Sequence, residues 1–175
     1  MTIAIDCTLM TALLLLLGIA SPLYALDTSS GFGLQDRALF QERVDYTLTN
    51  QSGTDFHGQN LASTSFAGAV GRGANFSEAD LSGAIFTQGA FAEAIFHGAD
   101  LSDALMDRAD FTGADLRDAL LSGVIASGSN FRNARIEGAD FSDALLDRED
   151  VRQLCQDASG VNSRTGIATA DSLGC

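Results

Sequence analysis

Five aspartates are the side chains in this sequence that come nearest to a metal-binding pattern. Asp80, Asp100 and Asp140 recur at multiples of an interval of 20, and Asp103 and Asp143 each lie three positions after one of them. Carboxylate oxygens are the ligands that Ca²⁺ prefers, but a calcium site takes six to eight oxygens. Aspartates that brace turns through their own side chains are therefore the favoured interpretation. A calcium-dependent enzyme that uses this acidic face is kept as an alternative.

The histidines and serines lack the partners that catalysis requires. His57 and His97 lie two such intervals apart, and no third ligand occurs at a matching spacing, so we expect no metal site. Four serines recur at the same interval: Ser82, Ser102, Ser122 and Ser142. Neither histidine lies on the same face as these serines. A serine nucleophile needs its base within hydrogen-bond reach. We therefore predict a protein that is not an enzyme, with no catalytic, metal-binding or cofactor-binding residues and no cofactor.

A five-residue period runs through the chain from Phe56 onward. Large apolar residues occupy nearly every fifth position: Phe56, Leu61, Phe66, Phe76, Leu81, Phe86, Phe91, Phe96, Leu101, Met106, Phe111, Leu116, Leu121, Phe131, Ile136, Phe141, Leu146 and Val151. Only Gly71 and Ala126 interrupt the series. In most repeats an alanine lies two positions before the large residue, so the unit reads A-[D/N]-[L/F]-x-x.

A period of five fits neither a helix nor a flat strand. On an α-helix each step of five rotates by about 140°, which would scatter the large residues around the cylinder. In a strand an odd period would point successive large residues to opposite faces. The chain keeps all of them on one side only if it turns once per repeat. Alanine and Phe or Leu then point inward, the residue between them points outward, and the last two form the corner.

The number of repeats per coil follows from which positions resemble one another. At an interval of 20 the serines above form one column, and the outward residues Ile85, Leu105, Ile125 and Leu145 form another. At an interval of 15 no such columns appear. We therefore predict an all-β solenoid with four repeats per coil and about five coils between residues 51 and 151. At about 4.8 Å per coil the shaft would be roughly 24 Å long.

The repeats resemble the pentapeptide-repeat family over residues 54–151. This resemblance implies a right-handed quadrilateral β-helix. The sequence departs from the pattern at its start, where Thr54, Gln59 and Thr64 replace the inward alanine and Gly71 replaces a large core residue. We expect the first coil to be looser or bulged there. Acidic relatives that imitate duplex DNA suggest an alternative function, a nucleic-acid mimic that inhibits a DNA-binding enzyme, although export of the chain would count against it.

Residues 1–25 have the pattern of a secretory signal peptide. The apolar run of residues 9–20 is short for a membrane span, and small residues at its end and shortly after it predict cleavage after Ala25 or Ala20. The segment before the run carries Asp6 and no basic residue, which leaves an uncleaved membrane anchor open. We expect an exported protein. Together with the C-terminal cysteines, this makes the chain similar to exported pentapeptide-repeat proteins of cyanobacteria and chloroplasts, so we expect it in the thylakoid lumen or the periplasm.

Caps are expected at both ends, because an open solenoid end invites stacking against another copy. At the N-terminal end, residues 26–50 form the predicted cap, with a helix over residues 34–47. At the C-terminal end, a short helix over residues 147–156 leads into a cap of residues 152–175. Cleavage of the signal would remove Cys7 and leave Cys155 and Cys175, and an even pair in an exported chain favours a disulfide.

Charge and one apolar column give the functional expectation. The formal net charge is −13 and every basic residue is arginine, which argues against nucleic-acid binding and suits a basic partner. The column Ile85, Leu105, Ile125 and Leu145 would form an outward apolar ridge about 14 Å long. Either residues 159–173 fold over the ridge or it is a contact surface. We predict a structural or protein-interaction module that binds an unknown protein or itself through this ridge or the acidic face.

Overall fold

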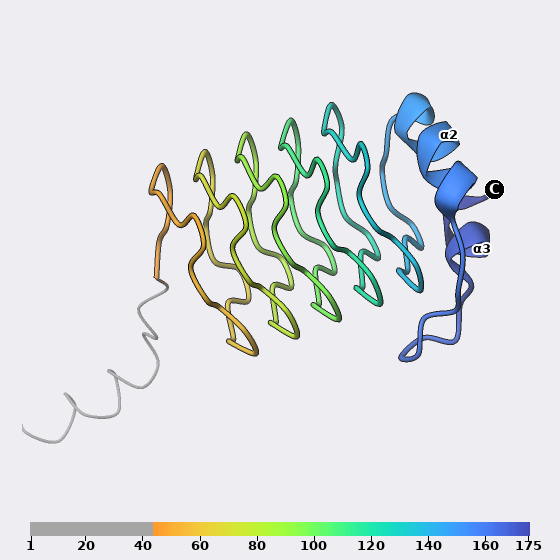
Figure 1. The fold of residues 1–175 in the computed structure, drawn as a ribbon, viewed down its shortest axis with the longest axis horizontal. Coiled ribbons are helices and arrows are strands. Elements are labelled where there is room, and N and C mark those ends of the chain that lie inside the picture. The colour runs from red at the N-terminus through yellow and green to blue at the C-terminus, as the bar shows by residue number, and fades with distance from the viewer. Residues whose placement is uncertain (1–43) are drawn as a thin grey trace, which may run out of the picture. The chain divides into compact units, whose positions relative to one another are not determined.

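The computed structural model describes residues 44–175. These residues form a stack of similar coils, followed at the C-terminal end by two short helices, α2 (Arg148–Asp157) and α3 (Thr169–Leu173) (Figure 1). None of the helices described in residues 44–175 is long and apolar enough to cross a membrane. The predicted signal peptide over residues 1–25 lies outside the described residues.

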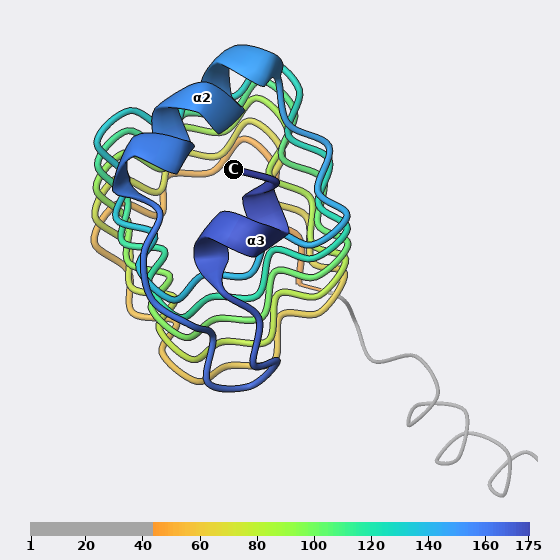
Figure 2. The same cartoon turned by 90° about the vertical axis from the view of Figure 1, so that its right-hand side faces the viewer.

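A single register relates all of the coils. Each parallel bridge joins a residue to the one 20 positions later, from the pair Asp45 and Ser65 to the pair Ile125 and Leu145. The predicted interval of four repeats per coil is therefore confirmed. Each five-residue repeat forms one side of a coil and contributes only one bridging residue. The coils therefore pair through isolated bridges and not through long strands. Seen along the stack, the coils superpose as a four-sided outline (Figure 2).

The corners are β-turns that repeat at every fifth position. In each, the N–H at the inward alanine position donates to the carbonyl of the inward residue three positions earlier, as from Ala99 to Phe96. The last residue of each unit has a positive φ, for example 67° at Gly98 and 58° at Asp103. Glycine adopts this left-handed conformation without a steric penalty, whereas other residues pay a cost of about 1–2 kcal/mol. Glycine at this position therefore relaxes the corner.

The interior is a ladder of aromatic rings with alanines between them. Phe76 stacks on Phe56 and on Phe96, at centroid distances of 4.8 Å and 4.9 Å. On another side Phe66 stacks on Phe86 at 5.2 Å. These rings are buried, and so is the alanine column, which brings the four sides close enough for the rings to meet. The inward assignment of both residue types is confirmed.

The expected defect around Gly71 does not occur. Val70 bridges to both Asn50 and Ala90, so the register continues without a bulge. The ring of Phe91, one coil later, fills the space, since a Cβ added at Gly71 would overlap that ring. The prediction of a bulge at Gly71 was wrong, because the large Phe91 side chain of the following coil compensates for the missing one.

The solenoid begins earlier than predicted. Residues 44–47, the end of the predicted helix over 34–47, belong to the first coil. Asp45 bridges to Ser65, and the ring of Tyr46 stacks on Phe66 at 4.9 Å. For these four residues the helix prediction was wrong. The remainder of that helix, and residues 26–43 of the predicted N-terminal cap, lie outside the described residues.

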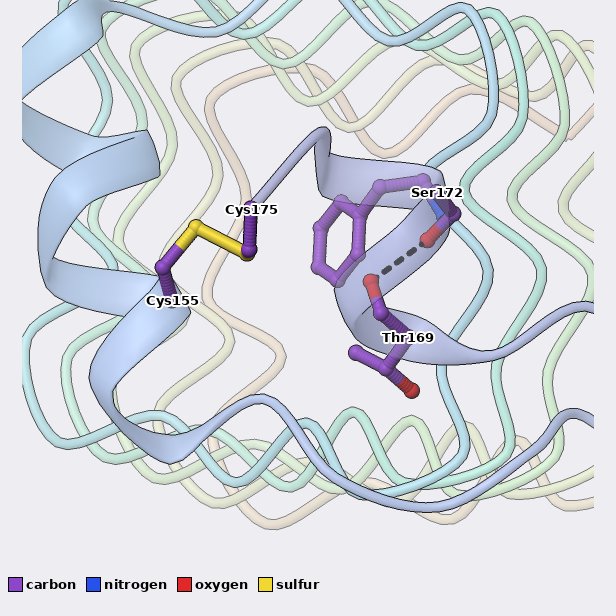
Figure 3. The surroundings of a disulfide bond; sticks show 5 residues. Cys155, Thr169, Ser172 and Cys175 are labelled. Carbon is purple, nitrogen blue, oxygen red and sulfur yellow. Dashed lines mark hydrogen bonds between the residues drawn. A yellow bond between two sulfur atoms is a disulfide. The ribbon is translucent and has the colours of Figure 1, made fainter.

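The C-terminal cap covers the last coil. Helix α2 buries Leu154 and α3 buries Leu173 against the core, while Val151 is only half-buried. A disulfide joins Cys155 of α2 to Cys175 after α3, and the Ser172 hydroxyl donates to the Thr169 carbonyl beside it (Figure 3). The predicted helix over 147–156 agrees with α2 to within one residue at each end.

The cap also pairs backbone groups that the last coil would otherwise leave open. Gly138 N–H donates to the Ser159 carbonyl at 2.8 Å, and Phe141 N–H donates to the Ser172 hydroxyl at 3.0 Å. Unpaired edges of this kind are templates for association with another chain. The cap therefore closes the solenoid chemically as well as sterically.

Candidate protein-interaction surface

The predicted apolar ridge exists and lies on one side of the solenoid. Consecutive bridges join Ile85 to Leu105, Leu105 to Ile125, and Ile125 to Leu145, so the four side chains stack in one column. Ile85 and Leu105 are half-buried, whereas Ile125 is 36% and Leu145 is 59% exposed. We call these four residues the apolar ridge.

The ridge replaces side chains that brace the turns elsewhere. In most repeats an Asp or Asn at this position accepts a hydrogen bond from the N–H two residues later, as Asp100 does from Ser102 and Asp110 from Thr112. Asp45 and Ser65, the first members of the ridge column, make this bond. The four ridge residues have no acceptor to make it with. Each lost bond forgoes about 0.5–1.5 kcal/mol, so these outward apolar side chains do not serve the stability of the turns.

The two edges of the ridge differ in charge. One edge carries the serine column together with the exposed carboxylates Asp103 and Asp143, and within residues 44–175 it has no basic residue. The other edge alternates acids and bases: Asp107, Arg108, Asp147 and Arg148. The ridge therefore has one acidic border and one border of mixed charge.

The C-terminal segment does not cover the ridge. Asn162 donates to the Gly138 carbonyl at 2.8 Å, and Arg164 donates to the carbonyls of Ala99 and Asp118 at 2.9 Å and 3.3 Å. These carbonyls lie at the corner that precedes the acidic face, not on the ridge side. The alternative in which residues 159–173 fold over the ridge was wrong, because their polar side chains pair with backbone carbonyls at that other corner.

The aspartates of the acidic face brace turns. Asp80 accepts from the N–H and hydroxyl of Ser82, and Asp140 accepts from the same groups of Ser142. No cluster of three or more potential metal ligands occurs within residues 44–175. Of the two histidines, His97 faces Asp118 at 3.5 Å. The loop that carries Arg164 also brings a positive charge to the corner beside this face.

Asp140 and Asp115 have their pKa shifted downward by their surroundings. Burial alone would raise the pKa of Asp140, but the hydrogen bonds from Ser142 outweigh it and hold this pKa below its usual value. Burial also opposes ionisation at Asp115, yet its bidentate contact with Arg117, at 2.6 Å and 2.7 Å, lowers the pKa of Asp115. Arg135 adds to this effect from 3.5 Å. These carboxylates stabilise the fold when they are ionised.

The pKa of Asp140 predicts how stability changes in acid. Since the folded-state pKa is below the ordinary carboxyl value, its contribution is complete above about pH 4 and is lost as the pH falls through the lower folded value. We expect Asp140→Asn, which keeps an oxygen acceptor for Ser142, to lose less stability than the wild type between about pH 5 and pH 2. Urea unfolding across this range measures the difference. Parallel curves for the two proteins would contradict the prediction.

Sequence reasoning missed the polar contacts of the C-terminal segment. Asn162 is fully buried and organises its own turn by accepting from the N–H groups of Arg164 and Thr165. It lies beyond the repeats, so no periodic signal marked it. An open groove of about 300 Å³ beside Arg117 and Arg135 was also not predicted, and its lining includes the acids Glu137 and Asp157. Charges of both signs line this groove.

The geometry by itself defines the class of protein. It is a four-sided β-solenoid of five-residue repeats, with a filled aromatic core and its variable chemistry on the outside. Comparison gives the family: the pentapeptide repeat model matches residues 52–88, 90–123 and 109–148, and the chain belongs to this family. Pentapeptide-repeat proteins are right-handed quadrilateral β-helices that serve as structural or interaction modules, and no catalytic family is indicated.

A solved structure supports the assignment. The chain is similar to a pentapeptide repeat protein from the thylakoid lumen of Arabidopsis thaliana, with 38% sequence identity, a TM-score of 0.73, and coverage of 74% of this chain and 90% of that one. It also matches Rfr23 from the cyanobacterium Cyanothece 51142, with 27% identity over 59% of this chain and 65% of that one and a TM-score of 0.35. A search among curated proteins returned no match.

Proposed function

We propose that this chain is a non-enzymatic interaction module of an exported compartment and that it docks a protein through the apolar ridge. The observation that carries the proposal is a column of four outward apolar side chains, two half-buried and two exposed, at positions where other repeats use a bracing Asp or Asn. A contiguous apolar stripe on an acidic body is typical of a contact surface. The filled core leaves the outer surface as the place where function is expressed.

Three observations support the compartment. Residues 1–25 have the composition of a signal peptide. The cap carries a disulfide between Cys155 and Cys175, and such bonds persist in oxidising compartments. The similar Arabidopsis protein comes from the thylakoid lumen. We therefore propose export, with the thylakoid lumen favoured over the periplasm.

The test replaces the centre of the ridge. We expect Leu105→Asp combined with Ile125→Asp to abolish partner capture or self-association while changing the free energy of unfolding by less than about 1 kcal/mol, since Ile125 is exposed, Leu105 is only half-buried, and an Asp at either position can brace its turn. Cross-linking in the native compartment reports capture, light scattering reports self-association, and thermal unfolding reports stability.

A matched control uses exposed apolar residues on other sides. Val70 and Ile95 are 42% and 39% exposed, and neither bridges to a ridge residue. Val70→Asp with Ile95→Asp adds the same two negative charges and should leave docking intact. Retention of the partner by the ridge variant would overturn the proposal. Severe unfolding of the ridge variant alone would also overturn it, by showing that the ridge is internal.

A further inference from the structure

We infer that the partner presents an amphipathic α-helix whose apolar stripe is bordered on one side by lysine or arginine. This inference rests on the proposed function of the ridge and specifies what docks there. Two independent features of the surface support it: the spacing of the four ridge side chains and the charge difference between the two edges.

The spacing of the ridge suits a helix better than a strand. Adjacent coils are about 4.8 Å apart, so three steps from Ile85 to Leu145 span roughly 14 Å. A helix presents its apolar stripe once per turn, about 5.4 Å, and three turns span roughly 16 Å. A strand places side chains of one face about 6.8 Å apart, and three steps span roughly 20 Å. A helix of about three turns therefore stays in step with the ridge, whereas a strand does not.

The charges at the edges give the helix its chemistry and its orientation. Asp103 and Asp143 border the ridge beside the serine column, and this edge has no basic residue among those described. Behind it lie the half-buried carboxylate Asp100 and its neighbour Asp80. The opposite edge balances its two aspartates with two arginines. Basic side chains along one flank of the incoming helix would thus meet carboxylates on one edge only, and this fixes which way the helix faces.

The same charges disfavour a second copy as the occupant. Each chain carries a formal net charge of −13, so two copies repel one another. In the part of the chain that the structure describes, neither edge of the ridge carries a surplus of positive charge with which to meet the acidic edge of another copy. The negative charge that opposes dimerisation attracts a basic helix.

The experiment uses three labelled peptides with the oxidised, full-length protein, each long enough for about four helical turns. The first carries a leucine stripe at helical spacing with lysines on one flank, the second replaces the lysines with glutamates, and the third scrambles the first so that no stripe remains. Fluorescence anisotropy at low and physiological salt gives each Kd. Circular dichroism reports whether the bound peptide becomes helical.

The inference predicts a specific pattern of affinities. The striped lysine peptide binds the wild type and the Val70→Asp, Ile95→Asp control with similar Kd, and binds the Leu105→Asp, Ile125→Asp variant at least tenfold more weakly. The glutamate and scrambled peptides bind the wild type at least tenfold more weakly than the striped lysine peptide. Asp103→Asn with Asp143→Asn weakens binding of the lysine peptide and reduces its dependence on salt.

Contrary outcomes separate this inference from the proposed function. Equal binding of the scrambled and striped lysine peptides would overturn the inference, because net charge alone would then explain the affinity. Failure of the striped lysine peptide to bind, or ridge-dependent binding of the glutamate peptide, would also overturn it. Dimerisation through the ridge would replace the helix with a second copy. In each of these cases the proposed docking function of the ridge is decided separately, by whether the Leu105→Asp, Ile125→Asp variant still cross-links to a partner.

Discussion

Phe96→Ala lowers the free energy of unfolding by about 3–5 kcal/mol, which is among the largest effects expected of any single substitution in this chain. The Phe96 ring is fully buried and stacks on Phe76 at 4.9 Å, with edge contacts to Phe86 and Phe111 at 5.8 Å. The coils above and below are tied by backbone bridges and cannot close the space, so the lost contacts leave a cavity. Urea unfolding of the two proteins measures the difference.

The neighbouring residue provides the control. Ile95 precedes Phe96 but points outward and is 39% exposed. We expect Ile95→Ala to cost less than about 1 kcal/mol, because little apolar surface returns to water. A similar loss of stability in the two variants would contradict the alternation of inward and outward positions on which the whole solenoid depends.

The fold could be predicted because its cause is periodic. A large residue at every fifth position requires one turn per repeat, and the likeness of Ile85 to Leu105 and Ile125 at intervals of 20 gives the number of repeats per coil. The bridges between these residues have that register. Equivalent positions in successive repeats have the same structural environment. Their shared residue types therefore indicate that environment more clearly than any single residue does.

The failures occurred where a non-periodic contact decides the structure. Gly71 interrupts the pattern, and its effect depends on Phe91, which lies one coil later and fills the space. Residues 44–47 match a helical pattern in isolation, but the ring of Tyr46 finds Phe66 in the next coil and the segment becomes part of the solenoid. Local propensity is a weak guide when an adjacent coil offers bridges and a stacked ring.

The candidate site likewise has a part that the repeat pattern predicted and a part that it did not. The ridge was predicted because it is a column of the repeat. The contacts of Asn162 and Arg164 were not, because they join a segment without a period to carbonyls 24 and 65 residues earlier in the chain. These contacts hold the C-terminal segment at the corner beside the acidic face and leave the ridge uncovered, which the sequence pattern could not show.

Removal of the disulfide by Cys155→Ser and Cys175→Ser is the second change for which we expect a large effect. The bond closes a loop with a sequence separation of 20 residues, and in the chain-entropy model its loss costs about 3 kcal/mol. Since the bond ties α2 to the end of α3, the loss should fall mainly on the cap. The cap is also where Gly138 and Phe141 find acceptors at Ser159 and Ser172. Thermal unfolding and amide hydrogen exchange measure the two consequences.

Hydrogen exchange distinguishes local opening from a general loss of stability. The amides of Gly138 and Phe141 should exchange much faster in the double serine variant, because their acceptors belong to the cap. The amide of Phe96 donates to the carbonyl of Asp115 inside the stack and should keep most of its protection under native conditions. Reduction of the wild type should reproduce the pattern. Unchanged exchange at Gly138 and Phe141 would mean that Leu154, Leu173 and the contacts of Asn162 hold the cap without the disulfide.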